Sequence, residues 1–502
     1  MKKYILAICI LGTLCSSCEN NQEKIRNVED WTQYVEPRIG TAHCRWFHFT
    51  PGALPFGLAK PAPSTNGSLG NKWGWEATGY DYRENTIEGF PCLHEFQVGG
   101  IVLMPTSGKL VTVPGLPTDS VKTGYRSHFS RENEIATAGY YSVLLDDYQI
   151  QAELTATPRV AFQRFTFPKG TDNHILFNIG NRQGESGAVK DAYVTYTADG
   201  HIEGWVITMP EYVKKYQPGA TVPLYFSAVL DRKPESYGSF HGNTQLADAK
   251  ESKGTGAGMY FTFSNEQQEA VTAKIGLSYT SVENARINLQ AEAEGKTFEN
   301  AKEQAHQIWQ EYLGRIEVET SKKEDKVKFY TGLYHALLGR GLANDVNGAY
   351  PRNDGSVGQL PMKEGKPQYN VYNTDAAWGA QWNLSQLWTL AYPEYMSEYV
   401  SSHIQAYKDA GWLADGLANN RYVSGVGTNL LSTIIAGAYQ CGIRDFDTKL
   451  AYEACLKNEL DGKDRPFGAG KVNTAEFVKY GYVPHQDQGE GYHETFMFSA
   501  SH

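Results

Sequence analysis

Cysteine is scarce in this sequence, and its scarcity excludes two classes of fold. Seven cysteines occur in 502 residues, and beyond Cys18 only Cys44, Cys92, Cys441 and Cys455 remain. Their spacing fits no zinc motif, and so few thiols in so long a chain are not a disulfide framework. Cys44 and Cys92 could still pair in an oxidising compartment. With 41% hydrophobic and 20% charged residues, the chain can bury large cores.

An excess of positive charge is also absent. The net charge is −10, and the basic residues are scattered, so the sequence has no electrostatic footprint for nucleic acid. It contains no Walker loop, Gly-x-Ser-x-Gly elbow or Rossmann fingerprint. His493 and Glu494 are adjacent, but no second histidine stands at helical spacing, which excludes a zinc-protease motif. We expect no nucleic-acid partner.

The N-terminal apolar run is too short to span a bilayer. In "MKKYILAICILGTLCSSC", two lysines precede the run and small residues precede Cys18. Residues 1–18 resemble a bacterial lipoprotein signal, in which Cys18 becomes lipidated and attaches the protein to a membrane. An ordinary cleaved signal peptide is the alternative. Residues 19–30 are polar and are interpreted as a tether. We expect an exported protein, either periplasmic or held at the outer membrane or cell surface.

Alternation of apolar and polar residues dominates the first part of the chain. Between about Trp31 and Leu289, segments such as "AGYYSVLLDDYQIQAELTATPRVAFQRFTFP" have a period of two and are rich in Thr, Val, Tyr and Phe. Gly and Asp turns separate the segments, with no helical signal between them. Many short strands of this kind predict a β-sandwich. We assign residues 31–293 to an N-terminal β-sandwich domain.

The pattern becomes helical near residue 300. In "FENAKEQAHQIWQEYLGRIEVE", Ala305, Ile308, Trp309 and Leu313 form one apolar stripe. Further helical segments follow, and Pro393 begins one of them. We assign residues 294–502 to a helical domain, roughly half of a toroid. The final "YHETFMFSASH" has apolar residues at helical spacing and no terminating signal, so we expect the toroid to be incomplete in this sequence.

Several stretches together resemble glycoside hydrolase family 92, a family of exported α-mannosidases. "YVEPRIGT", "TPGALPFGLAKPAP", "GYDYRENTIEGF" and the strand-rich segment quoted above are similar to its early motifs. "FYTGLYHALL" and "AYQCGIRDFDTKLAYEA" are similar to its helices. The resemblance implies a β-sandwich followed by an (α/α)6 toroid. It also implies hydrolysis of terminal α-mannosides with inversion, and a bound Ca²⁺ that engages mannose hydroxyls.

The resemblance places the catalytic carboxylates outside this sequence. In the family, a Thr-Leu-Glu-Tyr segment carries the general acid, and "FSASH" is similar to its lead-in, so the acid is expected just past His502. A Gly-Asn-Asp-Asp segment that supplies the base lies further on. We therefore expect residues 1–502 alone to be inactive. Within the sequence, Glu490 and Glu494 are weak candidates for carboxylates in the cleft, although solvated loop charges are the commoner outcome.

Candidate sugar-binding residues come from three stretches. The resemblance places Trp75 where a sugar-stacking tryptophan would lie, with a sandwich-core tryptophan as the alternative. It places His94 and Glu95 in a histidine-containing stretch, where His94 would hydrogen-bond a hydroxyl or be a satisfied interface residue. "DAAWGAQW" adds Asp375, Trp378 and Trp382, with Asp375 also a candidate for a helix N-cap. "ADGLANN" is a loop that could face the same site.

The stretch "WGAQW" departs from the family's Trp-Asp-Thr-Phe-Arg motif. Trp378 is kept, but Gly379 replaces the aspartate and Trp382 replaces the arginine. The early His-Gly-His segment is altered too, to "HCRWFHF". These changes remove a carboxylate and a guanidinium that would bind hydroxyls. Two alternatives to an α-mannosidase therefore stay open: a glycosidase of the same fold with another sugar specificity, and a non-catalytic surface lipoprotein that binds glycans.

Overall fold

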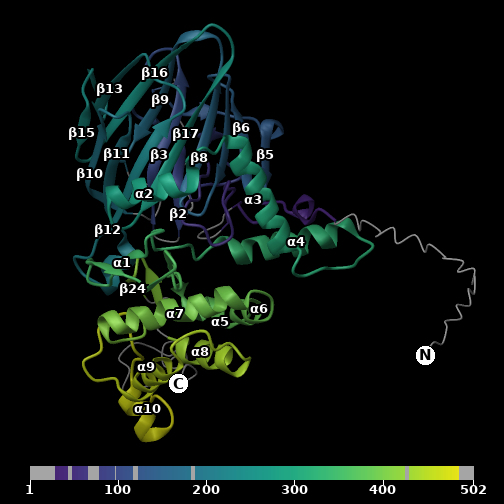
Figure 1. The fold of residues 1–502 in the computed structure, drawn as a ribbon, viewed down its shortest axis with the longest axis vertical. Helices are drawn as coiled ribbons and strands as arrows, with labels where there is room; N and C mark the ends of the chain where they lie inside the picture. Colours follow the sequence, from purple (N-terminus) through teal and green to yellow (C-terminus); the bar gives the residue numbers. More distant parts are fainter. Residues whose placement is uncertain are drawn as a thin grey trace, which may run out of the picture. The chain divides into compact units, whose positions relative to one another are not determined.

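The structure is a computed structural model that describes residues 29–42, 48–65, 79–95, 98–116, 123–181, 187–423 and 429–484. The description does not include the side chains of Glu95, Val98, Thr171, Tyr212, Asp375, Ala376 and Trp378. The described residues from Trp31 onward belong to the larger of two units into which the chain divides. In the larger unit a β-rich domain comes first and a helical domain follows (Figure 1). No helix within the described ranges is long and apolar enough to cross a membrane.

Two antiparallel sheets build the β-rich domain. One has nine strands in the order β15-β10-β11-β12-β17-β8-β7-β6-β5, and the other has six in the order β14-β13-β16-β9-β3-β2. The nine are β5 (Glu134–Thr137), β6 (Tyr140–Leu145), β7 (Ile150–Ala156), β8 (Val160–Phe167), β10 (Ala188–Tyr196), β11 (Ile202–Met209), β12 (Val222–Leu230), β15 (Glu251–Lys253) and β17 (Glu269–Ser278). The six are β2 (Phe90–Glu95), β3 (Val98–Ser107), β9 (Gly170–Asn178), β13 (Ser236–His241), β14 (Thr244–Ala247) and β16 (Ala257–Asn265). A two-stranded ribbon joins β1 (Thr86–Ile87) to β4 (Ser127–His128).

Aromatic side chains join the inner faces of the two sheets. Phe177 of β9 lies 6.4 Å from Phe226 of β12, measured between ring centroids. Phe167 of β8 lies 6.4 Å from Phe263 of β16. All four side chains are buried. The alternation in the sequence produces this arrangement, because side chains two residues apart along a strand point to the same face.

The outer face of the nine-stranded sheet is also covered. Helices α2 (Val282–Ala293) and α3 (Phe298–Leu313) lie on it (Figure 1). Val160 and Phe162 of β8 pack there against Leu289 and Phe298. The prediction of strands up to Leu289 is therefore wrong for the last residues, because the side chain of Ser281 caps α2 by accepting a hydrogen bond from the backbone of Asn284. A short helix, α1 (Glu211–Tyr216), also lies in the β-rich domain.

The helical domain contains α4 to α10 and several short strands. The helices are α4 (Lys323–Leu338), α5 (Ala377–Gln381), α6 (Leu384–Ala391), α7 (Pro393–Ala410), α8 (Leu431–Gln440), α9 (Thr448–Leu460) and α10 (Thr474–Tyr480). The strands are β18 (Ala349–Pro351), β19 (Val357–Gln359), β20 (Met362–Lys363), β21 (Lys366–Pro367), β22 (Asp375–Ala376), β23 (Gly416–Ala418) and β24 (Arg421–Val423). Pro393 begins α7, as the sequence predicts, and the Asp447 carboxylate caps α9 by accepting from the Leu450 amide.

Residues 49–62 connect the two domains. Phe56 inserts into the helical domain, where its ring stacks on Tyr395 with centroids 3.5 Å apart. Its backbone N–H donates to the Leu337 carbonyl and its carbonyl accepts from the Leu342 N–H, each at 2.9 Å. At the other end, a Cβ on Gly52 would lie 2.3 Å from the Leu154 carbonyl oxygen of β7. The segment is thus tied to both domains and fixes how they meet.

The thiol of Cys92 is free and buried. It accepts a hydrogen bond from the Gln163 side-chain amide at 3.2 Å, and burial raises its pKa. The pairing of Cys92 with Cys44 that the sequence left open is therefore not made. Cys44 and Cys18 lie outside the described residues.

Candidate functional site

A small three-stranded sheet organises the junction between the two domains. Strand β22 pairs with β23, with Asp375 opposite Leu417 and Ala376 opposite Gly416. Strand β23 pairs in turn with β24. The predicted Asp375–Trp382 stretch, which begins in β22 and continues through α5, is therefore held beside the "ADGLANN" segment. In Figure 1, β24 lies between the β-rich domain and α7.

The hairpin between β23 and β24 turns on two asparagines. Asn419 and Asn420 have φ angles of 50° and 56°, and they link the paired residues Ala418 and Arg421. A two-residue hairpin of this handedness needs positive φ at both positions, which asparagine tolerates better than most residues. Both asparagines are buried. The turn therefore places two amide groups inside the domain junction.

Amides from distant parts of the chain meet at this turn, and the amide cluster is our name for Gln217, Asn353, Asn373, Asn419 and Asn420. Gln217 is half-buried, and the other four are buried. The Asn373 side-chain oxygen accepts from the Asn419 backbone N–H at 2.6 Å, and its NH₂ donates to the Tyr279 hydroxyl at 3.1 Å. The Gln217 NH₂ donates to Asn353 Oδ1 at 2.9 Å, and the Asn353 NH₂ donates to the Asn420 carbonyl at 3.1 Å. Because Gln217 follows α1 and Tyr279 follows β17, the cluster binds both domains together.

The charged groups beside the amide cluster are few. Arg421 is buried and donates to the Asn353 carbonyl, and burial lowers the pKa of its guanidinium. Asp415, directly before β23, is also buried. The amide side chains hydrogen-bond one another and neighbouring groups, so the junction is polar with little net charge.

His94 lies in β2, at the β-rich side of the junction. Its Nδ1 is 3.3 Å from the Lys60 carbonyl oxygen, and its ring stacks on Phe49 at 4.9 Å. Lys60 belongs to the connecting segment 49–62. In the same segment, the Phe56 carbonyl accepts a hydrogen bond from the Leu342 N–H. The carbonyl of Gly341, the residue before Leu342, accepts from the Asn373 N–H at 2.9 Å. His94 and the amide cluster thus share one supporting segment.

The structure places the other predicted residues as follows. Trp75, Glu490 and Glu494 lie outside the described residues, so those predictions stay predictions. The backbones of Glu95, Asp375 and Trp378 lie in β2, β22 and α5, and their side chains are not described. Asp375 does not occupy the N-cap position of α5, because the helix begins at Ala377 and β22 includes Ala376. The Trp382 side chain is 67% exposed, so in this structure it faces solvent.

Sequence reasoning missed Gln217, Asn353 and Asn373 altogether. Amides in loops are common and carry no diagnostic spacing, so nothing in the sequence distinguished these three from solvated loop residues. Only the two asparagines of "ADGLANN" gave a signal, because paired Asn residues favour a tight turn.

The described residues do not form a metal site. Within the ranges that the structure covers, no group of three or more His, Cys, Asp or Glu side chains is placed to hold a metal ion. Ca²⁺ takes six to eight oxygen ligands, usually including carboxylates. The residues that the structure describes therefore do not fit the implied Ca²⁺.

The architecture defines a protein with a β-rich domain, a helical domain and a polar site at their junction. Residues 34–278 match the glycosyl hydrolase family 92 N-terminal domain, and residues 284–500 match the glycosyl hydrolase family 92 catalytic domain. The chain therefore belongs to glycosyl hydrolase family 92, and the resemblance found in the sequence is confirmed.

Individual relatives agree with this assignment. An uncharacterized secreted glycosidase of Arthroderma benhamiae is 25% identical over 493 residues, which is 91% of this chain and 56% of the relative. A family 92 α-mannosidase of Bacteroides thetaiotaomicron, solved with mannoimidazole, is 23% identical with a TM-score of 0.80 over 94% of this chain and 60% of its own. A family 92 inverting mannosidase of the same organism is 23% identical, with a TM-score of 0.77 over 92% of this chain and 59% of its own. The chain thus spans somewhat more than half of the length of these relatives.

Proposed function

We propose that this chain provides the β-rich domain and part of the helical domain of an exported glycosidase that hydrolyses terminal α-mannosides. Membership of family 92 supports a glycosidase. Two similar structures are described as an α-mannosidase and an inverting mannosidase, which supports the sugar and the stereochemistry. At their level of identity these structures establish a shared fold, so substrate and mechanism belong to the proposal.

The observation that carries the proposal is the pairing of β22 with β23 beside the amide cluster. The pairing brings the segment with Asp375 and Trp378 to the buried amides of Asn373 and Asn419. Sugar hydroxyls both donate and accept hydrogen bonds, as amides do, and a tryptophan face offers an apolar surface to a pyranose ring. The junction is therefore suited to hold one sugar residue.

Hydrolysis with inversion needs two carboxyl groups. One protonates the leaving oxygen, and the other activates a water on the opposite face of the ring, so the two stand roughly 6.5–9.5 Å apart. The proposal assigns neither role to a described residue, and both stay where the resemblance places them, outside residues 1–502. Calcium dependence is likewise proposed from the resemblance alone. The described residues would bind and orient the sugar.

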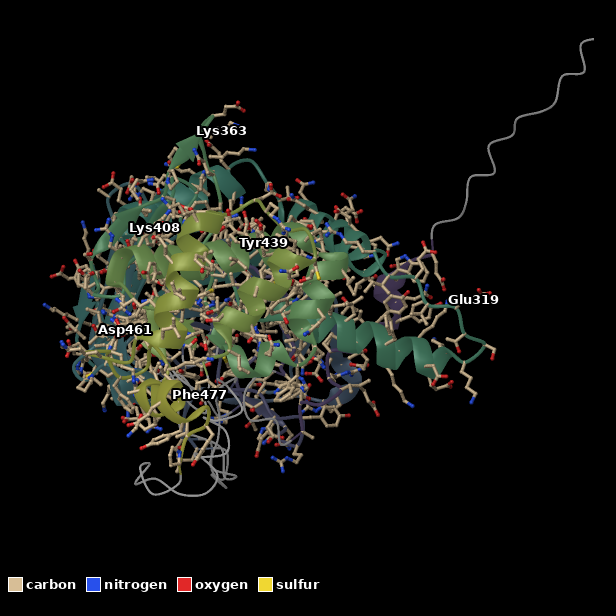
Figure 2. The ribbon with its side chains drawn as sticks, turned by 90° about the horizontal axis from the view of Figure 1, so that it is seen from below. Glu319, Lys363, Lys408, Tyr439, Asp461 and Phe477 are labelled. Carbon is tan, nitrogen blue, oxygen red and sulfur yellow. The ribbon has the colours of Figure 1, made fainter. Side chains whose placement is uncertain are left out.

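We also propose that the helical domain belongs to an (α/α)6 toroid. Large apolar side chains are exposed on α6, α8, α9 and α10, among them Leu390, Tyr439, Tyr452, Leu460 and Val478. Tyr439 is seen on α8 in Figure 2. Amphipathic helices usually bury such faces against neighbouring helices, as helix pairs do around a toroid.

Export by lipidation of Cys18 is part of the proposal. The relative from Arthroderma benhamiae is described as secreted, which supports export. Mass spectrometry of the protein made in a bacterial host should find a lipid on Cys18 and none in a Cys18→Ser variant. Recovery of an unmodified protein cleaved elsewhere would favour the ordinary signal peptide.

A second function, glycosidase activity on another sugar, is favoured by Gly379. A Cβ at this position would meet no atom within 4 Å, and its φ is not in the left-handed region, so the backbone does not require glycine. The missing carboxylate is thus a difference in chemistry rather than a steric necessity. The double variant Gly379→Asp with Trp382→Arg restores the family's pair, and it should increase affinity for mannose over other hexoses. If it does not, the altered motif does not set specificity.

Two assays test the main proposal. Purified residues 19–502 should not hydrolyse an aryl α-mannoside, whereas the whole protein should; turnover by residues 19–502 would refute the placement of the carboxylates. Binding of a non-hydrolysable thiomannoside to the same chain should be lost in Trp378→Ala. The matched control is Trp205→Ala, which removes a tryptophan of β11 whose ring packs against Tyr193 in the β-rich domain, with centroids 4.7 Å apart. Equal binding by both variants would show that Trp378 does not line the sugar site.

A further inference from the structure

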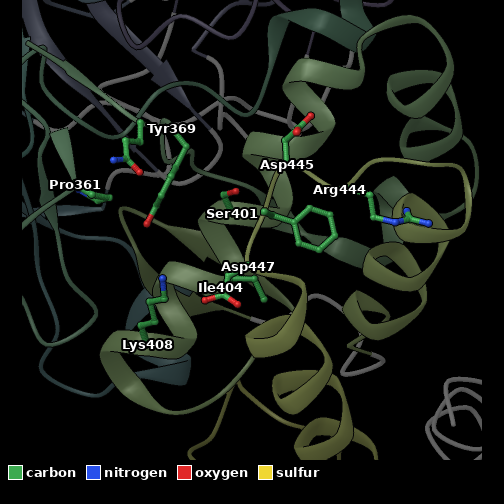
Figure 3. A pocket seen from close by; sticks show the side chains of 10 residues that line it. Pro361, Tyr369, Ser401, Ile404, Lys408, Arg444, Asp445 and Asp447 are labelled. Carbon is green, nitrogen blue, oxygen red and sulfur yellow. The ribbon is translucent and has the colours of Figure 1, made fainter. Parts of the chain in front are cut away.

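A cavity lies on the helical domain, and we call it the outer pocket. Its volume is about 390 Å³, within the size range of small-molecule sites. The walls come from the region of the β20–β21 hairpin, from α7 and from the loop between α8 and α9 (Figure 3). The lining residues are Pro361, Gln368, Tyr369, Ser401, Ile404, Lys408, Arg444, Asp445, Phe446 and Asp447.

The outer pocket and the amide cluster have no residue in common. Ser401 and Lys408 lie two turns apart on one face of α7, whereas Tyr399 and His403 lie on roughly the opposite face, because each residue advances about 100° around a helix. Tyr399 packs inward against Trp388, with ring centroids 5.3 Å apart. Lys408 is seen on the same side of the domain as Lys363 of the β20–β21 hairpin (Figure 2). The pocket is therefore on the outward face of α7.

Polar groups in the outer pocket are available to a ligand. Ser401 is 6% exposed, and within the described part of the chain its hydroxyl has no hydrogen-bond partner, although it lines the cavity. The Lys408 ammonium likewise has no partner there. Asp447 accepts from the Leu450 amide through one oxygen, which leaves its other oxygen for a ligand. Figure 3 shows Lys408 and Asp447 extending into the space from different elements, below Tyr369.

Two aromatic rings, Tyr369 and Phe446, complete the lining. The Tyr369 hydroxyl donates to Gln405 at 2.7 Å, which fixes the orientation of its ring. Arg444 contributes little charge inside, because its guanidinium lies over the Tyr439 ring at 3.5 Å and donates to the Ile443 carbonyl at 3.0 Å, and in Figure 3 it points away. In Figure 3 the Asp445 carboxylate also points away, so the charge that extends into the cavity is one ammonium, from Lys408, with one carboxylate, from Asp447. This balance gives no excess of positive charge for an anion.

We propose that the outer pocket is an accessory binding site for a neutral pyranose sugar, separate from the site at the domain junction. An aromatic ring would pack against the apolar face of the sugar. The Ser401 hydroxyl, the Lys408 ammonium and the free Asp447 oxygen would hydrogen-bond its hydroxyls, since ionised partners make the stronger bonds. Such a site would hold a second residue of a branched or neighbouring glycan against the outside of the helical domain. The inference does not rest on the proposed reaction.

Titration of the full chain with methyl α-D-mannopyranoside, followed by isothermal calorimetry or saturation-transfer NMR, tests the proposal. Tyr369→Ala should weaken binding at this site about tenfold, the loss expected for one aromatic face. Tyr369→Phe keeps the ring and should bind within about twofold of wild type. Asp447→Asn removes the charge but keeps a good N-cap for α9, and it should weaken binding without lowering the melting temperature. Tyr452→Ala, on the exposed face of α9, is the matched control.

Each outcome decides the question. Absence of binding, or binding that Tyr369→Ala leaves unchanged while Trp378→Ala abolishes it, would overturn the outer site. Mannose 6-phosphate is a second probe. If it binds at least tenfold more tightly than the methyl mannoside, and Lys408→Met removes that gain in affinity, the pocket is an anion site rather than a neutral-sugar site. Loss of aryl mannoside hydrolysis by the whole protein in Tyr369→Ala would place the pocket in the catalytic centre. Unchanged hydrolysis with weakened binding is the expected result.

Discussion

Replacing Phe56 by alanine should uncouple the two domains. Phe56 is the one aromatic residue of segment 49–62 that stacks on Tyr395, and it also makes edge contacts with Tyr312, Tyr372 and Trp388 at 6.4–6.5 Å. It is 4% exposed although it belongs to the segment that leaves the β-rich domain. Removal of the Phe56 ring leaves a cavity inside the helical domain, whereas the two hydrogen bonds of the Phe56 backbone can still form.

The size of the effect follows from burial and ring contact. Truncating a buried phenylalanine to alanine costs about 3–5 kcal/mol, including the cavity that remains. Of this, a stacked aromatic pair accounts for about 0.5–1.5 kcal/mol beyond its buried area. Because the ring belongs to one domain and its cavity to the other, the loss falls on the coupling between them. Phe56 has φ of 52°, and alanine keeps the Cβ, so the backbone strain is unchanged by the substitution.

Scanning calorimetry measures this directly. We expect wild type to melt with coupled domains, and Phe56→Ala to show two separated transitions, the first lowered by on the order of 10 °C. The control is Phe263→Ala, which removes a ring of equal size from the sandwich core, where it stacks on Phe167. That variant should lower the melting temperature of the β-rich domain without separating the transitions. A single unshifted transition in Phe56→Ala would refute the view that segment 49–62 couples the domains.

Three further predictions concern buried charge and metal binding. Burial lowers the pKa of His403 to about 3, below its unfolded value near 6.5, so folding stability is complete above pH 6.5 and is lost as the pH falls toward 3. In thermal melts between pH 7.5 and 5, wild type should lose about 1.4 kcal/mol of folding stability per pH unit below 6.5 relative to His403→Leu, which lacks the titrating ring. Equal slopes of stability against pH for the two proteins would contradict this. Glu88 and Arg126 form a buried ion pair at 2.7 Å, and Arg126→Met should cost about 3–5 kcal/mol in denaturant unfolding, with partial recovery in the double variant with Glu88→Leu. EDTA should abolish aryl α-mannoside hydrolysis by the whole protein, and Ca²⁺ should restore it; activity that survives chelation would remove calcium from the proposal.

Local patterns predicted most of the elements. The stripe through Trp309 is α3, and Trp309, Ala305 and Leu313 are fully or nearly fully buried. The alternating segment at 139–167 forms β6, β7 and β8. These predictions are confirmed because the period of the apolar residues determines which face of a helix or strand is buried. The prediction for residues 282–289 was wrong because this segment shows little helical periodicity. It is polar, and α2 has only a narrow apolar face, at Ala285, Leu289 and Ala293.

The candidate site was predicted less well than the fold. The sequence, through its family resemblance, pointed to the stretch at 375–382 and to the loop with Asn419, and the pairing of β22 with β23 brings these together. It gave no sign of Gln217 or Asn353, which lie far from them along the chain. It also gave no sign that Trp382 faces solvent, because exposure depends on which neighbours the fold supplies.

By itself, the sequence determined the division into a β-rich and a helical domain, the position of most helices and strands, and membership of family 92. These properties depend on hydrophobic periodicity and on short motifs, and both can be recognised in consecutive residues. Only the tertiary structure decided that Phe56 couples the domains, that five amides from four separate segments meet at the junction, and that a pocket lies on the outward face of α7. The reason is physical: such sites need side chains that are far apart in the sequence, and no local spacing encodes their meeting.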